Sequence, residues 1–425
     1  MSLWTRRPSV RRRRFGSEVR NENQSGVYAQ RPPQSTLLRR YDGPCITMNQ
    51  AIRSLFPVSE KYIYMNHAAV SPLSTRVRDA MQNLVEDVTQ NGSANYEDWC
   101  RTYEETRQSA ARLVNSRPHE IAFMRNTSDA LSAVANGIDW LEGDNVVSSN
   151  VEFPSNIYPW LRLREAHGVQ MKLAEERGGR IDPDELISLI DDRTRVVTIS
   201  WVQFASGYRS NLARIGKFCR ERGVIFVIDA IQGLGGLKLD VERDYVDAFA
   251  ADAHKYLIGP EGIALLYVSD RVIDRIKPTV LGWTSVKNYE QFSHRAVEYS
   301  LDYREGAERF ECGTLNTAGV YGLRAAIDLF LEAGPEKIEE YLLSLSDYLA
   351  ARLTSKGYEV VNPRNAGETS AIVTCTHPRH TPRDLHRLLN SKNIHTAPRM
   401  NRLRISPHFY NTRGEVDALI EALPE

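Results

Sequence analysis

A carboxylate and an amine follow two short apolar runs in the middle of the chain. The runs at 224–228 and 248–251 are continuous and bounded by turn residues or charges, a pattern typical of strands buried on both faces of a sheet. Asp229 closes the first run, and Lys255 follows the second after a short bend. Because open α/β sheets bind ligands at the carboxyl ends of their strands, we expect both side chains to lie in one site.

Together these two groups indicate carbonyl chemistry on an amine. A poorly solvated lysine has a lowered pKa and can form a Schiff base with an aldehyde. An acid held at a distance can pair with a protonated ring nitrogen and turn a pyridine into an electron sink. The combination predicts pyridoxal phosphate (PLP) as the cofactor. Taken singly, Asp229 could instead bind Mg²⁺ or cap a helix, and Lys255 could be a surface lysine before a turn.

A second candidate feature is the sequence RNTSDAL at 125–131, where an apolar run ends and a helix is expected to begin. Thr127 or Ser128 can cap this helix, and the free N–H groups of its first turn make an anion site. A plain helix cap without a ligand is the alternative interpretation.

Several motifs resemble, in the same order, those of the class V aminotransferase family. This family is the branch of fold-type I PLP enzymes that holds cysteine desulfurases, kynureninases and isopenicillin-N-epimerase-like proteins. The similarity extends from about Tyr62 to Glu425 and is carried by DAIQ at 229–232, AHKYL at 253–257 and GPEG at 259–262. It implies an α/β fold, with a large domain built on a mainly parallel central sheet and a small C-terminal α+β domain.

The resemblance also implies cofactor contacts spread along the chain: Asn126, Thr127 and Ser128 at the phosphate, Phe153 over the ring, Gln203 or Phe204 at its edge, Gln232 at the phenolic oxygen, and His254, Trp283 and Thr314 around them. His254 could instead only fill space. Desulfurases have a histidine in place of Phe153. Asp252 and Ala253 stand where the family often has a Ser or Thr for the phosphate, so that part of the site stays unassigned.

For the substrate, the resemblance points to Arg404 in the sequence RLRISPHFYNT at 402–412. An arginine fork suits bidentate binding of a carboxylate. Arg402 or Arg399 could serve instead, or all three could be surface charge. His67, in the opening motif YIYMNHAAVSP at 62–72, is a further candidate for substrate binding, or a structural histidine.

These features predict an enzyme that acts on an α-amino acid, with Lys255 removing the α-proton and Asp229 keeping the ring nitrogen protonated. The favoured reaction is transamination, followed by a kynureninase-like or β-eliminating lyase and by an epimerase. Cysteine desulfurase ranks below these, because residues 393–403 lack the nucleophilic cysteine that desulfurases carry there, and Cys375 lies in an apolar run. A PLP-binding regulatory protein with a nucleic-acid-binding tail is the alternative outside enzymes.

Composition sets the remaining bounds. The 425 residues are 42% hydrophobic and 25% charged with no net charge, so no global field favours nucleic acid or membrane. No apolar run has the eighteen or so residues of a membrane helix. The five cysteines are scattered without metal-ligand spacing, so we expect no metal, and we expect reduced thiols in a cytoplasmic setting.

We expect four regions along the chain. Residues 1–47 contain ten arginines and three acidic residues, and are predicted to be a disordered extension rather than a transit peptide or a nucleic-acid or lipid-binding tail. Residues 48–65 form an N-terminal segment, 66–305 the large PLP-binding domain and 306–425 the small domain. Thr314 belongs to a segment, 308–316, that in the family commonly reaches the neighbouring subunit's cofactor, so the resemblance implies a homodimer with shared active sites.

Overall fold

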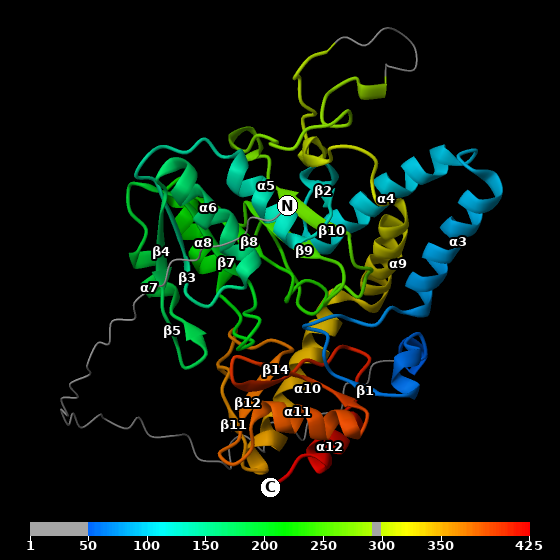
Figure 1. Cartoon of the computed structure of the whole chain (residues 1–425), viewed down its shortest axis with the longest axis vertical. Helices are drawn as coiled ribbons and strands as arrows, with labels where there is room; N and C mark the ends of the chain where they lie inside the picture. The colour runs from blue at the N-terminus through cyan, green and yellow to red at the C-terminus, as the bar shows by residue number, and fades with distance from the viewer. Residues whose placement is uncertain (1–49, 291–298) are drawn as a thin grey trace, which may run out of the picture. The chain divides into compact units, whose positions relative to one another are not determined.

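The computed structural model describes residues 50–290 and 299–425, and the arginine-rich segment 1–47 lies outside them. Its central sheet contains β2 (Ile121–Met124), β3 (Asn145–Ser149), β4 (Gln170–Ala174), β7 (Thr194–Ser200), β8 (Ile225–Asp229), β9 (Ala248–Asp252) and β10 (Ala264–Val268). The strand order is β2-β10-β9-β8-β7-β3-β4 (Figure 1). Strands β9, β8, β7, β3 and β4 pair in parallel, whereas β10 runs antiparallel to both of its neighbours. The predicted α/β fold with a mainly parallel sheet is therefore confirmed.

Both faces of this sheet are covered by apolar layers. Along β8, Ile225 and Val227 join the layer that contains residues of α5 (Thr127–Gly137) and α6 (Tyr158–His167). Phe226 and Ile228 point into the opposite layer, and all four side chains are fully buried. Since successive strand residues alternate between faces, burial on both sides requires the unbroken apolar runs seen in the sequence.

The other helices are α2 (Gln50–Arg53), α3 (Thr75–Asn91), α4 (Tyr96–Val114), α7 (Pro183–Ser188), α8 (Leu212–Glu221), α9 (Thr317–Ala333), α10 (Pro335–Ser355), α11 (Pro382–Ser391) and α12 (Arg413–Ala422). Helix α8 packs on β8, while α9 lies along α3 and α4 (Figure 1). No helix in the described part of the chain is long and apolar enough to cross a bilayer.

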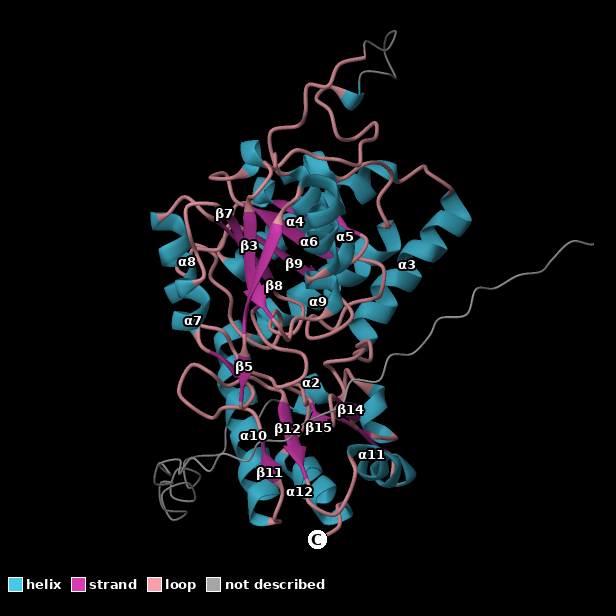
Figure 2. Cartoon of the chain, turned by 60° about the vertical axis from the view of Figure 1, so that its left-hand side comes forward, coloured by secondary structure: helices cyan, strands magenta, loops and turns pink. Residues whose placement is uncertain are grey.

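A second, antiparallel sheet lies in the C-terminal part of the chain. It contains β11 (Glu359–Val360), β12 (Val373–Thr376), β15 (Arg402–Ile405) and β14 (Ala397–Arg399), in that order, with α10, α11 and α12 beside it (Figure 2). The short strand β1 (Ile63–Tyr64) pairs in parallel with β13 (Ile394–His395) and ties the opening motif to this region. The predicted domain boundary at residues 305 and 306 stays a prediction.

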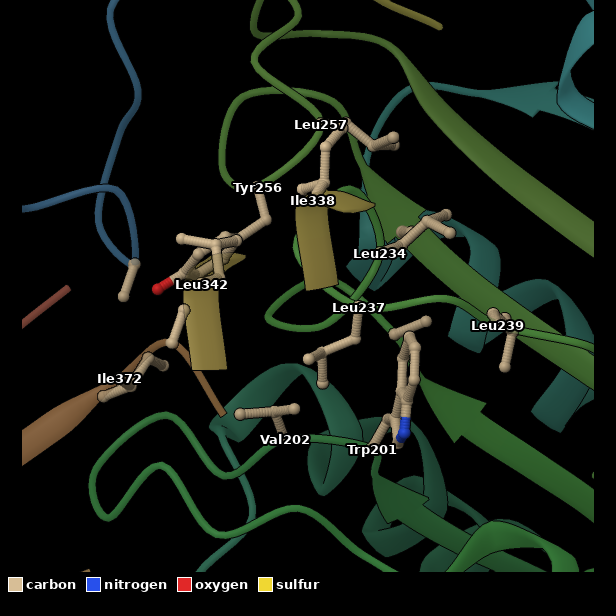
Figure 3. Packing of buried hydrophobic residues seen from close by; sticks show 14 of the residues in the cluster. Trp201, Val202, Leu234, Leu237, Leu239, Tyr256, Leu257, Ile338, Leu342 and Ile372 are labelled. Carbon is tan, nitrogen blue, oxygen red and sulfur yellow. The ribbon is translucent and has the colours of Figure 1, made fainter. Parts of the chain in front are cut away.

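The loop that follows Asp229 and the segment of Lys255 pack in a common core. Tyr256, next to Lys255, is fully buried among side chains that include Leu342 of α10 (Figure 3). Gly235 has a φ of 97° and faces the backbone of Tyr256 so closely that a Cβ atom would overlap it. Only glycine tolerates both that conformation and that approach, so the loop after Asp229 packs directly against the segment of Lys255.

A buried ion pair holds the segment before α9 against the central sheet. Arg107 Nη1 donates to Glu311 Oε1 at 2.9 Å, and the Phe123 amide donates to the same oxygen at 2.8 Å. Arg107 and Glu311 are only 2% and 5% exposed. Removing one partner would leave the other charge buried and unpaired.

We therefore expect Glu311→Ala to lower the free energy of unfolding by about 3–5 kcal/mol, measured by urea denaturation. The matched control is Glu332→Ala, since Glu332 pairs with Arg76 on the surface. That change should cost less than about 1 kcal/mol. Equal losses in the two variants would contradict a special role for the buried pair.

Candidate active site

Lys255 and Asp229 are both buried near the carboxyl ends of β9 and β8. Lys255 is 8% exposed and Asp229 is 2% exposed. Burial lowers the pKa of Lys255 to about 8, although Asp229 opposes this shift. Burial likewise raises the pKa of Asp229 to about 6, against a hydrogen bond from the Ile231 amide and the charge of Lys255. Near neutral pH these two groups are thus a carboxylate and an amine that can lose its proton readily.

The opening motif, residues 62–72, packs against the segment that carries Lys255. Ser71 Oγ donates to the Lys255 carbonyl at 2.6 Å, and the Ser71 amide donates to the His254 carbonyl at 2.7 Å. Gln232 Nε2 donates to the Ala68 carbonyl at 3.0 Å, while its Oε1 is buried without a partner in the described residues. One end of Gln232 is therefore fixed by the protein, and the other is left for a bound group.

His67 belongs to the same motif but is already fully hydrogen-bonded within the protein. Its Nδ1 lies 2.8 Å from the Ser406 carbonyl and its Nε2 lies 2.8 Å from the Tyr410 hydroxyl. The ring is completely buried, and burial lowers its pKa to about 4. With no ring nitrogen left for a ligand, His67 has a structural role, and we leave it out of the substrate site.

The low pKa of His67 predicts a pH effect on stability. Its pKa is about 4 in the folded chain and about 6.5 when unfolded, so protons bind the unfolded state preferentially between these values. The contribution of His67 to the free energy of unfolding is fully present above pH 6.5 and is lost as the pH falls toward 4. For this group alone the loss between pH 7.5 and 5.5 is about 1.3 kcal/mol. Urea unfolding of wild type and His67→Gln at both pH values isolates this contribution, because other groups titrate equally in both. Identical pH dependence in the two proteins would refute it.

The turn before α5 offers an anion site, although its cap differs from the prediction. Asn126, rather than Thr127 or Ser128, is the N-cap, and its side chain accepts from the Asp129 amide at 2.9 Å. Thr127 Oγ1 accepts from the Asp252 amide at 3.0 Å, and Ser128 Oγ bonds to Ser155 Oγ at 2.7 Å. The first helical bond comes only from the Ala130 amide, and the Asp129 amide is taken by Asn126, so the N–H groups of Thr127 and Ser128 are left open to an anion.

Asp129 and Asp252, two acidic residues near this turn, each lie beside a basic side chain of the protein. Asp129 points toward Arg125, whose Nη2 lies 2.6 Å from its Oδ1. Asp252 is 5% exposed and brings Oδ1 to 2.8 Å from Nδ1 of His254, without the alignment of a hydrogen bond. His254 thus lies beside the carboxylate that stands where the family often has a Ser or Thr.

Phe153 and Arg404 both contact Phe204, and Phe153 also lies beside Lys255. The Lys255 Nζ lies 5.3 Å from the centroid of the Phe153 ring, which meets Phe204 edge-on at 5.2 Å. Arg404 Nη1 donates to the Phe204 carbonyl at 2.8 Å. Arg404 is only 1% exposed, and its Nε and Nη2 have no partner in the described residues. Burial lowers its pKa to about 10, and a carboxylate would satisfy both free groups.

Of the alternatives to Arg404, Arg402 is held elsewhere, because its Nη2 lies 3.6 Å from Glu176 Oε1. Trp283 is 45% exposed and meets Tyr289 at 5.5 Å, and Thr314 is also exposed. Roles for Trp283 and Thr314 at a site shared with a second subunit stay predictions.

Glu152 is a site residue that the sequence analysis did not single out. It is 8% exposed and accepts hydrogen bonds from Gln203 Nε2 at 2.6 Å, Asn156 Nδ2 at 2.9 Å and both the amide and hydroxyl of Ser200, at 2.8 and 2.6 Å. Its charge helps to raise the pKa of Asp229. The sequence did contain a signal for Glu152, because it is an acidic residue just past the end of the buried strand β3. Gln203 is held by this carboxylate, and its Oε1 has no partner in the described chain.

This set of residues fits PLP. A buried amine of lowered pKa can take up the aldehyde, a buried acid can pair with the ring nitrogen, and an apolar ring can pack on the pyridine. The open first turn of α5 suits the phosphate. The unpartnered atoms of Gln232, Gln203 and Arg404 are the kind of buried polar groups that a ligand satisfies.

Comparisons with known proteins agree with this fit. The family described as Aminotransferase class-V matches residues 63–419. A protein of Methanothermobacter thermautotrophicus named "Probable cysteine desulfurase" is 30% identical, over 88% of this chain and 97% of its own length. A Bacillus subtilis protein named "Uncharacterized aminotransferase YcbU" is 26% identical, over 87% of this chain and 96% of its own.

Solved structures show the same fold. The apo structure of cysteine desulfurase from Thermococcus onnurineus NA1 superposes with a TM-score of 0.79 at 26% identity, covering 88% of this chain and 97% of that one. A C-DES variant with glycine covalently linked to its PLP cofactor gives a TM-score of 0.80 at 24% identity, covering 87% and 98%. The predicted family, fold and cofactor are confirmed: the chain belongs to the class V aminotransferase family and is a PLP-dependent enzyme of fold type I.

Proposed function

We propose that the enzyme is an aminotransferase that acts on a free α-amino acid. The observation that supports this most directly is the presence of a buried amine of lowered pKa, Lys255, and of a buried guanidinium, Arg404, whose Nε and Nη2 have no partner in the described residues. Phe153 lies beside Lys255 and meets Phe204, whose carbonyl accepts from Arg404, so a short series of contacts joins the amine to the guanidinium.

PLP, when bound, supplies an aldehyde for the substrate amine and a ring that accepts the electron pair released at the α-carbon. Arg404 binds the α-carboxylate through Nε and Nη2 and so fixes the α-carbon near Lys255. The neutral amine of Lys255 takes the α-proton and later returns it. With the cofactor bound, Asp229 would hold a proton at the ring nitrogen, and Phe153 would offer an apolar ring for the pyridine to pack on.

Transamination is favoured because a single amine can perform both proton transfers. Epimerisation requires a proton on the other side of the α-carbon, and the neighbouring Phe153 cannot carry one. Transfer of sulfur to the protein requires a reactive thiolate. Of the four cysteines in the described residues, Cys219 and Cys375 are buried, and burial raises the pKa of the Cys375 thiol to about 12. Cys100 is half-buried and Cys312 is exposed, but neither lies in residues 393–403, where desulfurases carry their nucleophile.

A β-eliminating lyase that acts on cysteine-type substrates is the second candidate. It is favoured by the relatives named as cysteine desulfurases, which include one 30% identical to this chain. Release of the sulfur as free sulfide would need no cysteine from the protein.

The experiment is an amino-acid panel with the PLP-loaded enzyme, scored for keto acid, inverted substrate and sulfide. Keto acid formed one for one with aminated cofactor supports the aminotransferase. Sulfide together with pyruvate from cysteine, without aminated cofactor, would instead establish the lyase. Inverted substrate without either product would establish an epimerase.

A further inference from the structure

Three arginines lie on one face of the β14–β15 hairpin. The antiparallel register places Arg399 opposite Arg402 and Ala397 opposite Arg404. Directly opposed residues share a face of the sheet, and residues two apart along a strand share it as well. Arg399 and Arg404 are therefore diagonal neighbours on this face, within reach of each other's long side chains.

The three arginines differ in their partners. Arg402 pairs with Glu176 at 3.6 Å. Arg399 Nη1 donates at 2.8 Å to the carbonyl of Pro398, its own neighbour, and Arg404 Nη1 donates to the Phe204 carbonyl. Within residues 50–290 and 299–425, no carboxylate lies within ion-pair distance of Arg399 or Arg404. The hairpin thus presents two cationic groups whose charges are not balanced by the described protein.

Both charges act on the active-site lysine. Arg404 and Arg399 each help to lower the pKa of Lys255, and Arg399 also lowers that of Arg404. Two guanidinium groups that repel each other beside an active site store an unfavourable interaction, which a ligand carrying two negative groups relieves. A single α-carboxylate would satisfy the free N–H groups of Arg404 and leave Arg399 unpaired.

We propose that the substrate is an acidic α-amino acid, one that carries a second carboxylate in its side chain. Arg404 binds the α-carboxylate and Arg399 binds the side-chain anion. This inference rests on the proposed function for the identity of the substrate as an amino acid, whereas the recognition of two anionic groups is a property of the hairpin.

The test measures the affinity of the PLP-loaded enzyme for carboxylic acids that have no amine. Titration calorimetry gives the dissociation constants. Succinate and glutarate carry two carboxylates, and butyrate and valerate are the matched monocarboxylates. We expect each diacid to bind roughly tenfold or more tightly than its monoacid, the size of one added charge-assisted pair. In Arg399→Gln the diacids should fall to the affinity of the monoacids, which should change less than about twofold.

Arg402→Gln is the matched control, because Arg402 shares the face but is paired with Glu176, and it should keep the preference for diacids. Arg404→Gln should weaken both classes of acid. Equal affinities of diacid and monoacid in the wild type would overturn the proposal. So would equal weakening of both classes by Arg399→Gln, since both arginines would then bind one carboxylate. If no amino acid of the panel gave a keto acid, the aminotransferase would be refuted. The preference for diacids would still test whether the hairpin recognises two anionic groups.

Discussion

Lys255→Ala will remove the borohydride-reducible bond between protein and cofactor and will slow amino-acid turnover by roughly 10³-fold or more. The variant loses the amine that forms the Schiff base and the group that carries the α-proton. Both losses act on the same steps, so added cofactor cannot compensate. The measurements are the visible spectrum with PLP, mass mapping of the borohydride-treated protein, and kcat.

The control for this prediction is Lys238→Ala. Lys238 is a partly exposed lysine whose Nζ lies 2.5 Å from Glu336 Oε1. It should leave both the spectrum and kcat unchanged. A Lys255→Ala protein with wild-type colour and turnover, or a borohydride adduct on another lysine, would show that the catalytic amine has been misassigned.

Asp229→Asn should lower kcat by roughly 10²–10⁴-fold while leaving the fold intact. The amide cannot stabilise a positive charge on the ring nitrogen, so electrons released at the α-carbon are accepted poorly. The hydrogen bond from the Ile231 amide to Oδ1, 3.0 Å long, can still form with the oxygen of asparagine. The thermal midpoint should therefore stay close to that of the wild type.

Asp229→Glu distinguishes charge from geometry, because it keeps the carboxylate but moves it. We expect its kcat to lie between those of the wild type and Asp229→Asn. An Asp229→Asn enzyme with an unchanged kcat, or one that lost activity only by unfolding, would contradict the assigned role. Cofactor affinity, measured by dialysis against decreasing PLP, separates weak binding from slow chemistry.

Much of the fold and the centre of the site could be predicted because their signals are local. Unbroken apolar runs mark β8 and β9, and Asp229 and Lys255 follow these runs at distances that the chain itself dictates. The antiparallel direction of β10 is not written in its own residues. An apolar run buried on both faces looks the same in either direction, and only its pairing with β2 and β9 decides.

The features that could not be predicted depend on partners far away in the chain. His67 bonds to Ser406 and Tyr410, more than three hundred residues later, so its structural role is invisible within its own motif. Thr127 or Ser128 was the predicted cap of α5, but Asn126 caps the helix and Thr127 is instead engaged by the amide of Asp252, far along the chain. The fate of the substrate after proton loss depends on the substrate as well as on the pocket, and no single residue encodes it.

The arginines proposed to bind the substrate and the residues proposed to carry the chemistry come from different sheets. Lys255 and Asp229 come from the strand ends of the central sheet, whereas Arg399 and Arg404 come from the antiparallel sheet of the C-terminal part. Mutations confined to residues 397–405 could therefore redirect the enzyme to another amino acid without rebuilding its proton transfer. Exchange of this hairpin among relatives offers an evolutionary route, and an engineering one, to new specificities on an unchanged catalytic core.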